Sequence, residues 1–469
     1  MENGSIQQRL GFSRPFFLGI GGSGMSSLAH ILADAGLEVS GYDGKKSQVT
    51  ENLEKKGVKI FSKLSDLEEN IGYDSAIYSS AIRLDSHPIA NFFKQKGIRF
   101  FHRSEVLHLC FEHLTCIAVG GSHGKTTTTA MTAHILNDLG YSPSVMVGGD
   151  VSFLNGVGGR FSPGKIGVFE SDESDGTFLN HKAQVRILTN IDEDHLDFYH
   201  TREKLLEAFS KFISAGTHTV VLDMDDPGIL DCLDLIQDKS KIFGFTSSLG
   251  SNAKSNGFKN LVHYKIENKK LIFFLDGKEF EITSRFPGKH YLTNSLAGVL
   301  AAYSLGADPE KASMSVSEYA GVKRRLEYIG NKDGVEIYDD YGHHPTEVQA
   351  VLSSIKELSG RDGRAVILFQ PHRFTRTKNL YREFAKSLDA GDIVFLLPIY
   401  SAGEEPIPGI TSELIANSMK TKPLLLSGDL KLDITFIRNT LKFGDRLITL
   451  GAGNVRDWGL AFMDSEEKK

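Results

Sequence analysis

Several features that would place a chain in a broad class at once are missing from this sequence. No apolar run reaches about 18 residues, the length that a membrane-spanning helix needs, so no such helix is expected. Residues 1–12 lack the basic patch and the apolar stretch of a signal peptide. Basic runs are also absent and the formal net charge is −6. Because nucleic acids are polyanions, this balance argues against them as partners.

Cysteine is scarce as well, with three residues in the chain: Cys110, Cys116 and Cys232. Their uneven spacing matches no pairing motif. Cys110 and Cys116 stand in apolar surroundings and are predicted to be core residues. A few unpaired cysteines indicate a reducing compartment, so we expect a cytoplasmic protein.

Glycine is abundant instead, with 47 of 469 residues, against about 7% in an average protein. This suits a fold with many strand-to-helix turns, and the length corresponds to about three domains. The predicted fold class is α/β. The predicted domains are a Rossmann-like domain at residues 1–112, a central P-loop-type domain at residues 113–322, and a doubly wound α/β domain at residues 323–469. The central sheet is expected to be mostly parallel, with antiparallel strands at its edge.

Short apolar runs and helical periodicity locate the elements. Strands are expected at residues 16–20, 37–42 and 75–78 in the first domain, and at residues 115–119, 166–169, 185–189, 219–222 and 241–245 in the second. Hairpin strands are expected at residues 261–266, 271–275 and 280–283. The third domain is expected to have strands at residues 335–338, 365–369, 393–397, 423–426 and 446–450. Helices are expected at residues 24–35, 291–305 and 346–358.

The most informative segment is a glycine-rich turn at residues 120–125, between an apolar strand and a helical pattern. Glycines let backbone N–H groups converge on a phosphate, and a helix N-terminus adds positive potential there. Lys125 can reach the β- and γ-phosphates of a nucleotide, and a threonine hydroxyl can bind Mg²⁺. Val119 stands where the strict P-loop pattern has glycine, so the turn is a shortened relative of that motif. A chance strand-to-helix turn is the alternative.

A second glycine-rich turn, at residues 19–24, also joins a predicted strand to a predicted helix. Asp43 ends the next predicted strand. This arrangement suits a nucleotide whose diphosphate lies at the helix N-terminus and whose ribose contacts the acid. The pattern alone is weak evidence. It favours NAD(P) or FAD as the ligand, with a tight packing turn as the alternative.

Acidic residues follow two predicted strands of the central domain. Glu170 opens the acidic string at residues 170–175, and His195 lies among acids at residues 190–197. Because parallel strands end at one edge of a sheet, these side chains are expected beside the phosphate-binding turn, where hard cations need oxygen ligands. Glu170 is the best candidate for one divalent cation, and His195 suggests a second. The alternatives are a solvated acidic turn and a histidine that caps a helix.

The third domain places cationic residues at predicted strand ends. Two arginines stand at residues 324–325, and the strings at residues 339–345 and 370–377 each follow a strand. Arginine neutralises charge on a transferring phosphoryl group and binds carboxylates through two hydrogen bonds. An exposed basic turn and purely structural histidines at residues 343 and 344 are the alternatives. The residues that suit a substrate carboxylate or phosphate are His372, Arg373 and Arg376.

Together and in this order, the motifs resemble those of the Mur ligase family. The matching stretches are residues 19–25, 121–129, 170–175, 189–197, 324–325, 339–347 and 370–377, with weaker support from residues 400–404 and 451–454. The resemblance runs through all three domains. It implies an ATP-dependent ligase of peptidoglycan precursor synthesis, which joins L-alanine to the carboxylate of UDP-N-acetylmuramate through an acyl phosphate and releases ADP and phosphate. ATP and Mg²⁺ are the implied cofactors.

The resemblance also implies a role for individual residues, and it assigns a UDP group, in place of NAD or FAD, to the first glycine turn. The implied contacts of the UDP-substrate are Gly19, Gly21, Gly22, Ser23, Gly24, Met25, Asp43 and Ser80. The implied ATP contacts are Gly121, Ser122, His123, Gly124, Lys125, Thr126, Thr127, Asn294, Arg325 and Asp340. The implied metal ligands are Thr126, Glu170 and His195, and the implied amino-acid contacts are Tyr341, His343, His372, Arg373 and Arg376. Catalytic roles are implied for Lys125, His195, Arg325, Asp340 and His343.

One position departs from the family pattern. Tyr291 stands where the family commonly has asparagine, three residues before the retained Asn294, which would read the adenine edge. Tyr291 either stacks on adenine or packs in the protein. The adenine contacts therefore depend most on Asn294.

Three other functions are weighed against this one. An acceptor that is a whole murein tripeptide would leave the chemistry unchanged, but the compact cationic and aromatic set around His372 favours a small amino acid. A dinucleotide-dependent oxidoreductase would explain residues 19–24 and give Lys125, Glu170 and His195 no joint purpose. A non-catalytic nucleotide-binding subunit would need a lost catalytic residue, and the motifs lack none. The expected partners are small-molecule substrates, with no nucleic acid and no membrane, and the expected assembly is a monomer or a homodimer.

Overall fold

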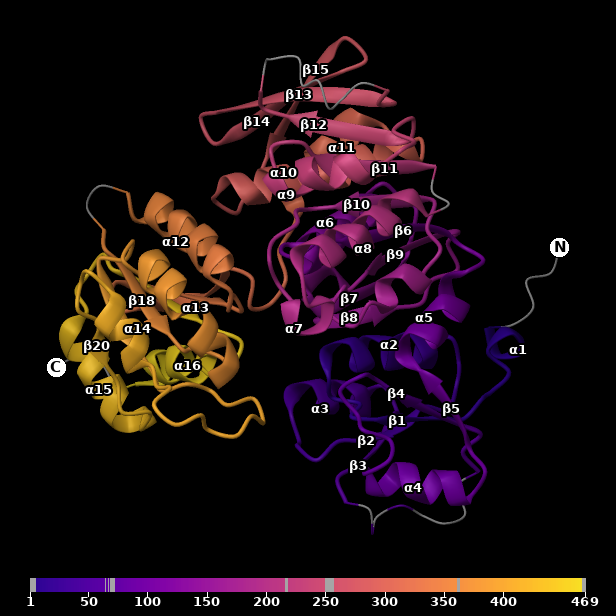
Figure 1. Cartoon of the computed structure of the whole chain (residues 1–469), viewed down its shortest axis with the longest axis horizontal. Coiled ribbons are helices and arrows are strands. Elements are labelled where there is room, and N and C mark those ends of the chain that lie inside the picture. Colours follow the sequence, from indigo (N-terminus) through magenta and orange to yellow (C-terminus); the bar gives the residue numbers. More distant parts are fainter. Residues whose placement is uncertain are drawn as a thin grey trace. The chain divides into compact units, whose positions relative to one another are not determined.

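The chain divides into two compact units, which are described separately below. The first comprises the residues up to Arg285 together with Leu292–Val322, and the second comprises Phe286–Tyr291 and the residues from Lys323 onward. The computed structural model describes residues 6–63, 65, 67, 72–215, 218–248, 257–360 and 363–465, apart from the side chain of Asp197. Figure 1 labels the helices and strands.

The N-terminal part of the first unit is built on a five-stranded parallel sheet in the order β3-β2-β1-β4-β5. In the central strand, Phe16, Phe17 and Leu18 are all fully buried. Such an apolar run without alternation is typical of a parallel strand that is covered on both faces. The elements of this part are α1 (Ile6–Leu10), β1 (Pro15–Leu18), α2 (Ser23–Asp34), β2 (Ser40–Tyr42), α3 (Gln48–Lys55), β3 (Lys59–Phe61), β4 (Ser75–Tyr78), α4 (Pro88–Gln95), β5 (Arg99–His102) and α5 (Arg103–Phe111).

The rest of the first unit contains a ten-stranded sheet in the order β15-β14-β13-β12-β11-β10-β6-β9-β7-β8. The strands from β13 to β7 in that order are parallel, whereas β14, β15 and β8 are antiparallel to their neighbours. Its strands are β6 (Thr115–Gly120), β7 (Ser144–Val151), β8 (Val157–Arg160), β9 (Ile166–Glu170), β10 (Val185–Leu188), β11 (Thr219–Asp223), β12 (Ile242–Thr246), β13 (Asn260–Glu267), β14 (Lys270–Leu275) and β15 (Lys278–Thr283).

Helices cover both faces of this sheet (Figure 1). The helix α6, which follows the glycine turn, is buried at every residue from Thr126 to Leu136. The helices are α6 (Lys125–Asp138), α7 (Leu196–Tyr199), α8 (Arg202–Ser214), α9 (Pro227–Cys232), α10 (Lys289–Ser304) and α11 (Pro309–Ser315), with short 3₁₀ turns η2 (Ser152–Leu154), η3 (Thr177–Asn180), η4 (Leu233–Leu235) and η6 (Val316–Glu318).

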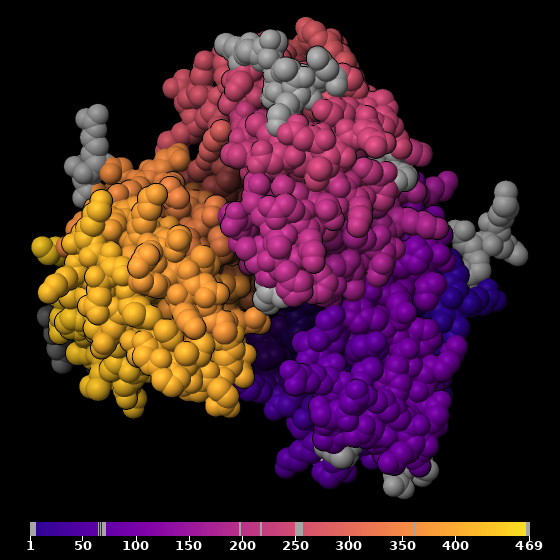
Figure 2. Space-filling model, viewed as in Figure 1, coloured from indigo at the N-terminus to yellow at the C-terminus, as the bar shows by residue number. Residues whose placement is uncertain are grey.

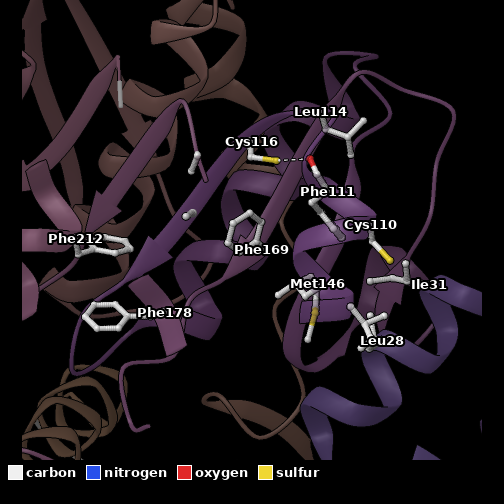
Figure 3. Packing of buried hydrophobic residues seen from close by; sticks show 14 of the residues in the cluster. Leu28, Ile31, Cys110, Phe111, Leu114, Cys116, Met146, Phe169, Phe178 and Phe212 are labelled. Atoms are coloured by element: carbon white, nitrogen blue, oxygen red, sulfur yellow. Dashed lines mark hydrogen bonds between the residues drawn. The ribbon is translucent and has the colours of Figure 1, made fainter. Parts of the chain in front are cut away.

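The two parts of the first unit are joined by a shared core. Figure 2 shows the indigo-to-purple part against the magenta part, and Figure 3 shows the core in between. Leu28 and Ile31 of α2 and Phe111 of α5 belong to one cluster with Cys116 of β6 and Phe169 of β9. Across the same boundary, the hydroxyl of a serine on α2, Ser27, donates a hydrogen bond to the carbonyl of Val147 at 2.7 Å. The relative position of the two sheets within this unit is therefore fixed by packing.

The second unit has a six-stranded sheet in the order β16-β17-β21-β18-β19-β20, in which only the edge strand β16 is antiparallel. Helices lie on both faces of the parallel strands (Figure 1), as in other doubly wound folds. The elements are β16 (Glu327–Lys332), β17 (Val335–Asp340), α12 (Pro345–Ser359), β18 (Ala365–Phe369), α13 (Phe374–Leu388), β19 (Ile393–Leu396), α14 (Glu413–Ser418), β20 (Leu424–Leu425), α15 (Leu430–Thr440), β21 (Arg446–Leu450) and α16 (Arg456–Asp464).

The predicted fold class is confirmed: the chain is α/β, with a Rossmann-like sheet, a mostly parallel central sheet with antiparallel edge strands, and a doubly wound C-terminal part. Cys110 and Cys116 are buried as predicted, and burial raises the pKa of each thiol to about 12. The prediction was wrong in detail where it placed Glu170 after its strand, because this residue is the last one of β9. Among the described helices, none combines the length and the apolar character needed to cross a membrane.

Candidate active site

The phosphate-binding turn follows β6 and ends where α6 begins, at Lys125. Gly124 is the N-cap of α6 and has a φ of 79°, and Gly121 has a φ of 128°. Both angles are in the region that favours glycine. A Cβ atom on Gly121 would also collide with the hydroxyl of Thr189. The turn therefore needs glycine at both positions.

The residues that follow β10 hold this turn in shape. The carbonyl of His123 accepts hydrogen bonds from Thr189 Oγ1 at 2.6 Å and from Asn190 Nδ2 at 3.0 Å, and its backbone N–H donates to Asn190 Oδ1 at 2.8 Å. The backbone N–H of Asp192 donates to Ser122 Oγ at 2.9 Å. A divalent-cation site was predicted in this segment from His195 and the neighbouring carboxylates, and the role of the segment in bracing the turn was not predicted.

Lys125 is held inside the turn that it belongs to. Its ammonium donates to the carbonyl of Gly121 at 2.6 Å, to the carbonyl of Ser122 at 3.1 Å and to Glu173 Oε1 at 2.9 Å. Burial works to lower the pKa of Lys125, but the carboxylates of Glu173 and Asp172 outweigh it and leave the pKa raised. The lysine is therefore charged and close to the N-terminus of α6.

Thr126 and Glu170, both predicted as metal ligands, lie next to each other. The hydroxyl of Thr126 donates to Glu170 Oε1 at 3.0 Å, and the other carboxylate oxygen accepts the backbone N–H of Gly148 at 2.7 Å. A hydroxyl and a carboxylate at the edge of a phosphate-binding turn are the oxygen donors that Mg²⁺ prefers. The residues present thus fit a divalent cation.

His195 lies beside a second carboxylate that the sequence analysis did not single out. Its Nε2 is 3.8 Å from Glu173 Oε1 and 3.6 Å from Asp194 Oδ2. One ligand atom from each of Asp172, Glu173 and His195 can be chosen so that all three lie within 4.8 Å of one another. Glu173 is three residues beyond Glu170 in the same acidic string. This string was therefore the feature of the sequence that could have indicated Glu173. The prediction chose Glu170 because it follows the strand directly.

Asn294, predicted to contact adenine, projects from α10 toward the same turn. Its Nδ2 lies 3.2 Å from the position that a Cβ atom on Gly124 would take. Tyr291 belongs to the second unit. Its ring stacks on that of Phe286 at a centroid distance of 4.9 Å, and its hydroxyl donates to the carbonyl of Arg325 at 3.0 Å. Of the two roles considered for Tyr291, these contacts describe packing.

The first glycine turn, between β1 and α2, is organised by Asp43. The carboxylate of Asp43 accepts the backbone N–H of Gly21 at 2.8 Å and that of Lys45 at 3.1 Å. A Cβ atom on Gly24 would collide with the guanidinium of Arg103, which therefore lies against the first turn of α2. Arg103 was not predicted, because it is far along the chain and belongs to no motif.

Ser80, predicted to contact the UDP group, lies at the boundary between the two sheets of the first unit. Its hydroxyl donates to Asp175 Oδ2 at 2.6 Å and is 3.0 Å from His102 Nε2. The structure thus links the N-terminal part directly to the acidic string that contains Glu170 and Glu173. The other residues predicted to contact the UDP group lie in the first glycine turn and at the start of α2. They are Gly19, Gly22, Ser23 and Met25.

In the second unit, Asp340 ends β17 and is almost completely buried. Its carboxylate accepts the backbone N–H groups of Leu326 and Gly342, each at 2.7 Å. Burial raises the pKa of Asp340 to about 6, although the nearby Arg325 works in the opposite direction. Arg325 lies over the ring of Tyr341, with its guanidinium carbon 5.4 Å from the ring centroid. Asp340 therefore fixes the segment that carries Arg325.

The residues predicted to bind the amino acid form one cluster in the second unit. The rings of His343 and His372 have centroids 5.8 Å apart, and His372 stacks on Tyr400 at 5.7 Å. Mainly because of burial, the pKa of each of these histidines is lowered to about 4, so both are neutral near pH 7. Within the described part of the chain, His372 Nδ1 and Arg376 Nη1 are buried and lack hydrogen-bond partners. Arg373 is exposed nearby, with a φ of 72°.

Comparison with known proteins identifies the family. Residues 16–113 match the model of the Mur ligase family catalytic domain, residues 119–302 match the Mur ligase middle domain, and residues 324–453 match the Mur ligase glutamate ligase domain. These three matches cover most of the chain. The chain belongs to the Mur ligase family and is a ligase.

Individual relatives agree with this. The chain is 37% identical over 463 residues to UDP-N-acetylmuramate–L-alanine ligase of Dictyoglomus turgidum, with 97% of each chain covered. It superposes on the crystal structure of UDP-N-acetylmuramate–alanine ligase of Thermotoga maritima with a TM-score of 0.78 at 25% identity, covering 96% of this chain and 98% of that one. A murein peptide ligase of Psychrobacter arcticus gives a TM-score of 0.69 at 21% identity, with coverage of 96% and 98%, which shows the fold alone.

Proposed function

We propose that the chain is the ATP-dependent ligase that joins L-alanine to the carboxylate of UDP-N-acetylmuramate in peptidoglycan precursor synthesis. The observation that carries this proposal is the phosphate-binding turn with Lys125 at its end and the Thr126–Glu170 pair beside it. Relatives that match nearly the whole chain and are named for this reaction support the choice of substrates.

The chemistry requires a carboxylate to become a better acyl donor. A carboxylate oxygen of the substrate attacks the γ-phosphorus of ATP, the bond to the β-phosphate oxygen breaks, and ADP leaves. The amine of alanine then attacks the acyl phosphate, loses a proton, and expels phosphate through a tetrahedral intermediate. Lys125 neutralises charge on the migrating phosphoryl group, and Arg325 contributes to binding the nucleotide.

We assign the three parts of the chain to the three ligands. Residues 1–112 bind the UDP group through the first glycine turn, Asp43 and Ser80. Residues 113–322 bind ATP through the second glycine turn and Asn294. Residues 323–469 bind the amino acid, with His343 and Tyr341 beside His372 and with Arg373 or Arg376 at its carboxylate. The two uncompensated polar atoms of His372 and Arg376 support this last assignment, because buried polar groups normally have partners.

Divalent cations complete the site in this proposal. Thr126 and Glu170 would hold one Mg²⁺ and His195 would contribute to a second. When bound, such an ion supplies positive charge to the phosphate oxygens and to the acyl oxygen. The protein residues orient the substrates and exclude water around them.

The decisive experiment measures phosphate release from Mg-ATP with UDP-N-acetylmuramate, in the presence and absence of L-alanine. Release that depends on alanine, together with a UDP-muramoyl-alanine product of the correct mass, is the expected result. Release that requires the murein tripeptide instead would assign the chain to peptide recycling. No release with either acceptor would contradict the proposed reaction.

A further inference from the structure

Glu173 occupies a position between Lys125 and His195 that the proposed roles leave unexplained. Its side chain is only 1% exposed. The backbone carbonyl of Glu173 accepts a hydrogen bond from the hydroxyl of Tyr199 at 2.6 Å, which ties the acidic string to α7, the helix that begins directly after His195. The residue is therefore held in place from two sides.

The two carboxylate oxygens of Glu173 have different surroundings. Oε1 accepts the ammonium of Lys125 at 2.9 Å and is 3.8 Å from His195 Nε2. Oε2 is buried and lacks a hydrogen-bond partner in the described part of the chain. A buried carboxylate needs both a counter-charge and hydrogen bonds, and here it has one strong partner. Because Oε1 is the oxygen that lies 3.8 Å from His195 Nε2, a cation that replaces the ammonium there would lie beside the histidine.

Lys125 is fully engaged in this state. An ammonium has three donors, and those of Lys125 go to the carbonyls of Gly121 and Ser122 and to Glu173. A nucleotide phosphate can recruit the lysine only if at least one of these bonds breaks. If the bond to Glu173 breaks, a buried carboxylate loses its counter-charge next to His195 and Asp172.

We propose that Glu173 is a positioning residue that holds Lys125 in the empty turn and, once Lys125 moves to the triphosphate, becomes a ligand of the divalent cation beside His195. This inference rests on the proposed function, since it takes the triphosphate and the cation from that reaction. It adds Glu173 to a cation site for which the family resemblance supplied only His195. The proposal also predicts an order of binding. The metal ion beside His195 binds after the nucleotide, because the ammonium of Lys125 must leave Glu173 before the metal ion can bind there.

The first test counts bound Mn²⁺ by electron paramagnetic resonance in the absence of nucleotide. Lys125→Met removes the ammonium and keeps most of the side-chain volume, so it should bind one more Mn²⁺ per chain than the wild type. The double variant Lys125→Met with Glu173→Gln should lose this additional ion, whereas Lys125→Met with Glu207→Gln, which neutralises an exposed carboxylate on α8, should keep it. An unchanged count in Lys125→Met, or an ion that persists in the first double variant, would overturn the proposal.

The second test uses the complex with a non-hydrolysable ATP analogue and does not depend on the fold of a Lys125 variant. Wild type should bind two Mn²⁺ per chain, and Glu173→Gln and His195→Ala should each bind one. In turnover, Glu173→Gln should lower kcat by about 10- to 100-fold, as is common when the support of a metal site is removed. Its KM for ATP should stay the same or fall, because Glu173 no longer competes for Lys125. A purely structural role would instead raise KM and lower the thermal stability, and it would leave two ions bound.

These measurements separate the inference from the proposed function. The Mn²⁺ counts need neither the muramate substrate nor alanine, whereas alanine-dependent phosphate release by the wild type tests the reaction. Normal release with unchanged counts would refute the inference alone. Changed counts without release would refute the proposed reaction alone.

Discussion

The first unit contains two glycine turns that have the same place between a strand and a helix but different side chains. In each case a buried parallel strand leads through glycines into a helix, β1 to α2 and β6 to α6. In the first turn the N–H of Gly21 is occupied by the carboxylate of Asp43, and α2 opens with a serine. In the second, α6 opens with Lys125 and Thr126. Under the proposed function, the first turn only holds a phosphate group and the second also takes part in its transfer, and the side chains of the first helical turn make this difference.

The two turns also differ in how they are braced. Thr189 and Asn190, at the end of the neighbouring strand β10, hold the second turn by hydrogen bonds to His123. The first turn depends on Asp43, which directly follows β2, and on Arg103 packed against Gly24. Each turn is thus supported by two side chains, which come from one segment at the second turn and from two separate elements at the first.

The largest effect is expected from removing the lysine that distinguishes the second turn. Lys125→Ala should lower kcat by about 10³-fold, because a charge aimed at the transferring phosphoryl group is lost from a site with little water. Ser23→Ala, the matched change at the start of α2, should leave kcat within about threefold. Both are measured by alanine-dependent phosphate release. A Lys125→Ala enzyme that retains a tenth of the activity would remove the distinction between the turns.

The sequence was enough to predict which residues gather at the second turn. It was not enough to predict the side chains that hold these residues in place. Lys125, Thr126 and Glu170 lie together because parallel strands end at one edge, which is a property of the fold class. Glu173 and Asn190 depend on the path of the loops after β9 and β10, and Arg103 reaches Gly24 from α5. No local pattern encodes the contacts of Asn190 and Arg103, whereas the acidic string at residues 170–175 offered a signal for Glu173. The backbone of a glycine turn accepts the diphosphate of many ligands. The pattern at residues 19–24 therefore does not distinguish a UDP group from NAD(P) or FAD, and taken alone it favoured NAD(P) or FAD.

The same contrast applies to the strands. The antiparallel edge of the central sheet was predicted because residues 260–283 contain short strand-like runs joined by polar turns. β16 was missed, because Glu327–Lys332 is a polar edge strand with a break in its register to β17. Tertiary pairing with β17, rather than the intrinsic preference of its residues, makes it a strand.

The second largest effect is expected at Asp340, the last residue of β17. Like Asp43, Asp340 accepts two backbone N–H groups, but Asp340 is buried and its pKa is raised to about 6. The folded state therefore binds this proton more tightly than the unfolded state. Stability of the second unit should fall as pH rises from about 4 to about 6, by up to about 3 kcal/mol, and then level off.

Urea unfolding can check this through the fluorescence of Trp458, the single tryptophan, which is buried in the second unit. Asp340→Asn cannot titrate, so its stability relative to wild type should improve as pH rises through this window. It should carry a constant loss of about 1 kcal/mol, because the amide group offers one acceptor fewer. A difference between the two proteins that does not change with pH would contradict the raised pKa.

The next effect compares glycines of the two turns. Gly121→Ala should destabilise the first unit by about 2 kcal/mol and raise KM for ATP, since its φ of 128° disfavours a side chain and the added Cβ collides with Thr189. Gly24→Ala meets only the end of the Arg103 side chain, which can move, so it should cost less than about 0.5 kcal/mol. Far-UV circular dichroism in urea measures both. Equal losses would mean that the two turns are equally constrained.

The smallest effect is expected at Asp43, one of the two supports of the first turn. Asp43→Ala removes the acceptor of the Gly21 and Lys45 N–H groups, which is worth about 1 kcal/mol for groups that water can reach afterwards. KM for UDP-N-acetylmuramate should rise about fivefold while KM for ATP stays unchanged, because the brace of the second turn is elsewhere. Asp43→Asn keeps one acceptor and should fall in between. Initial-rate measurements give both KM values. If KM for ATP rose in parallel, the two turns would be coupled. Holding phosphate and transferring phosphate could then not be assigned to one turn each.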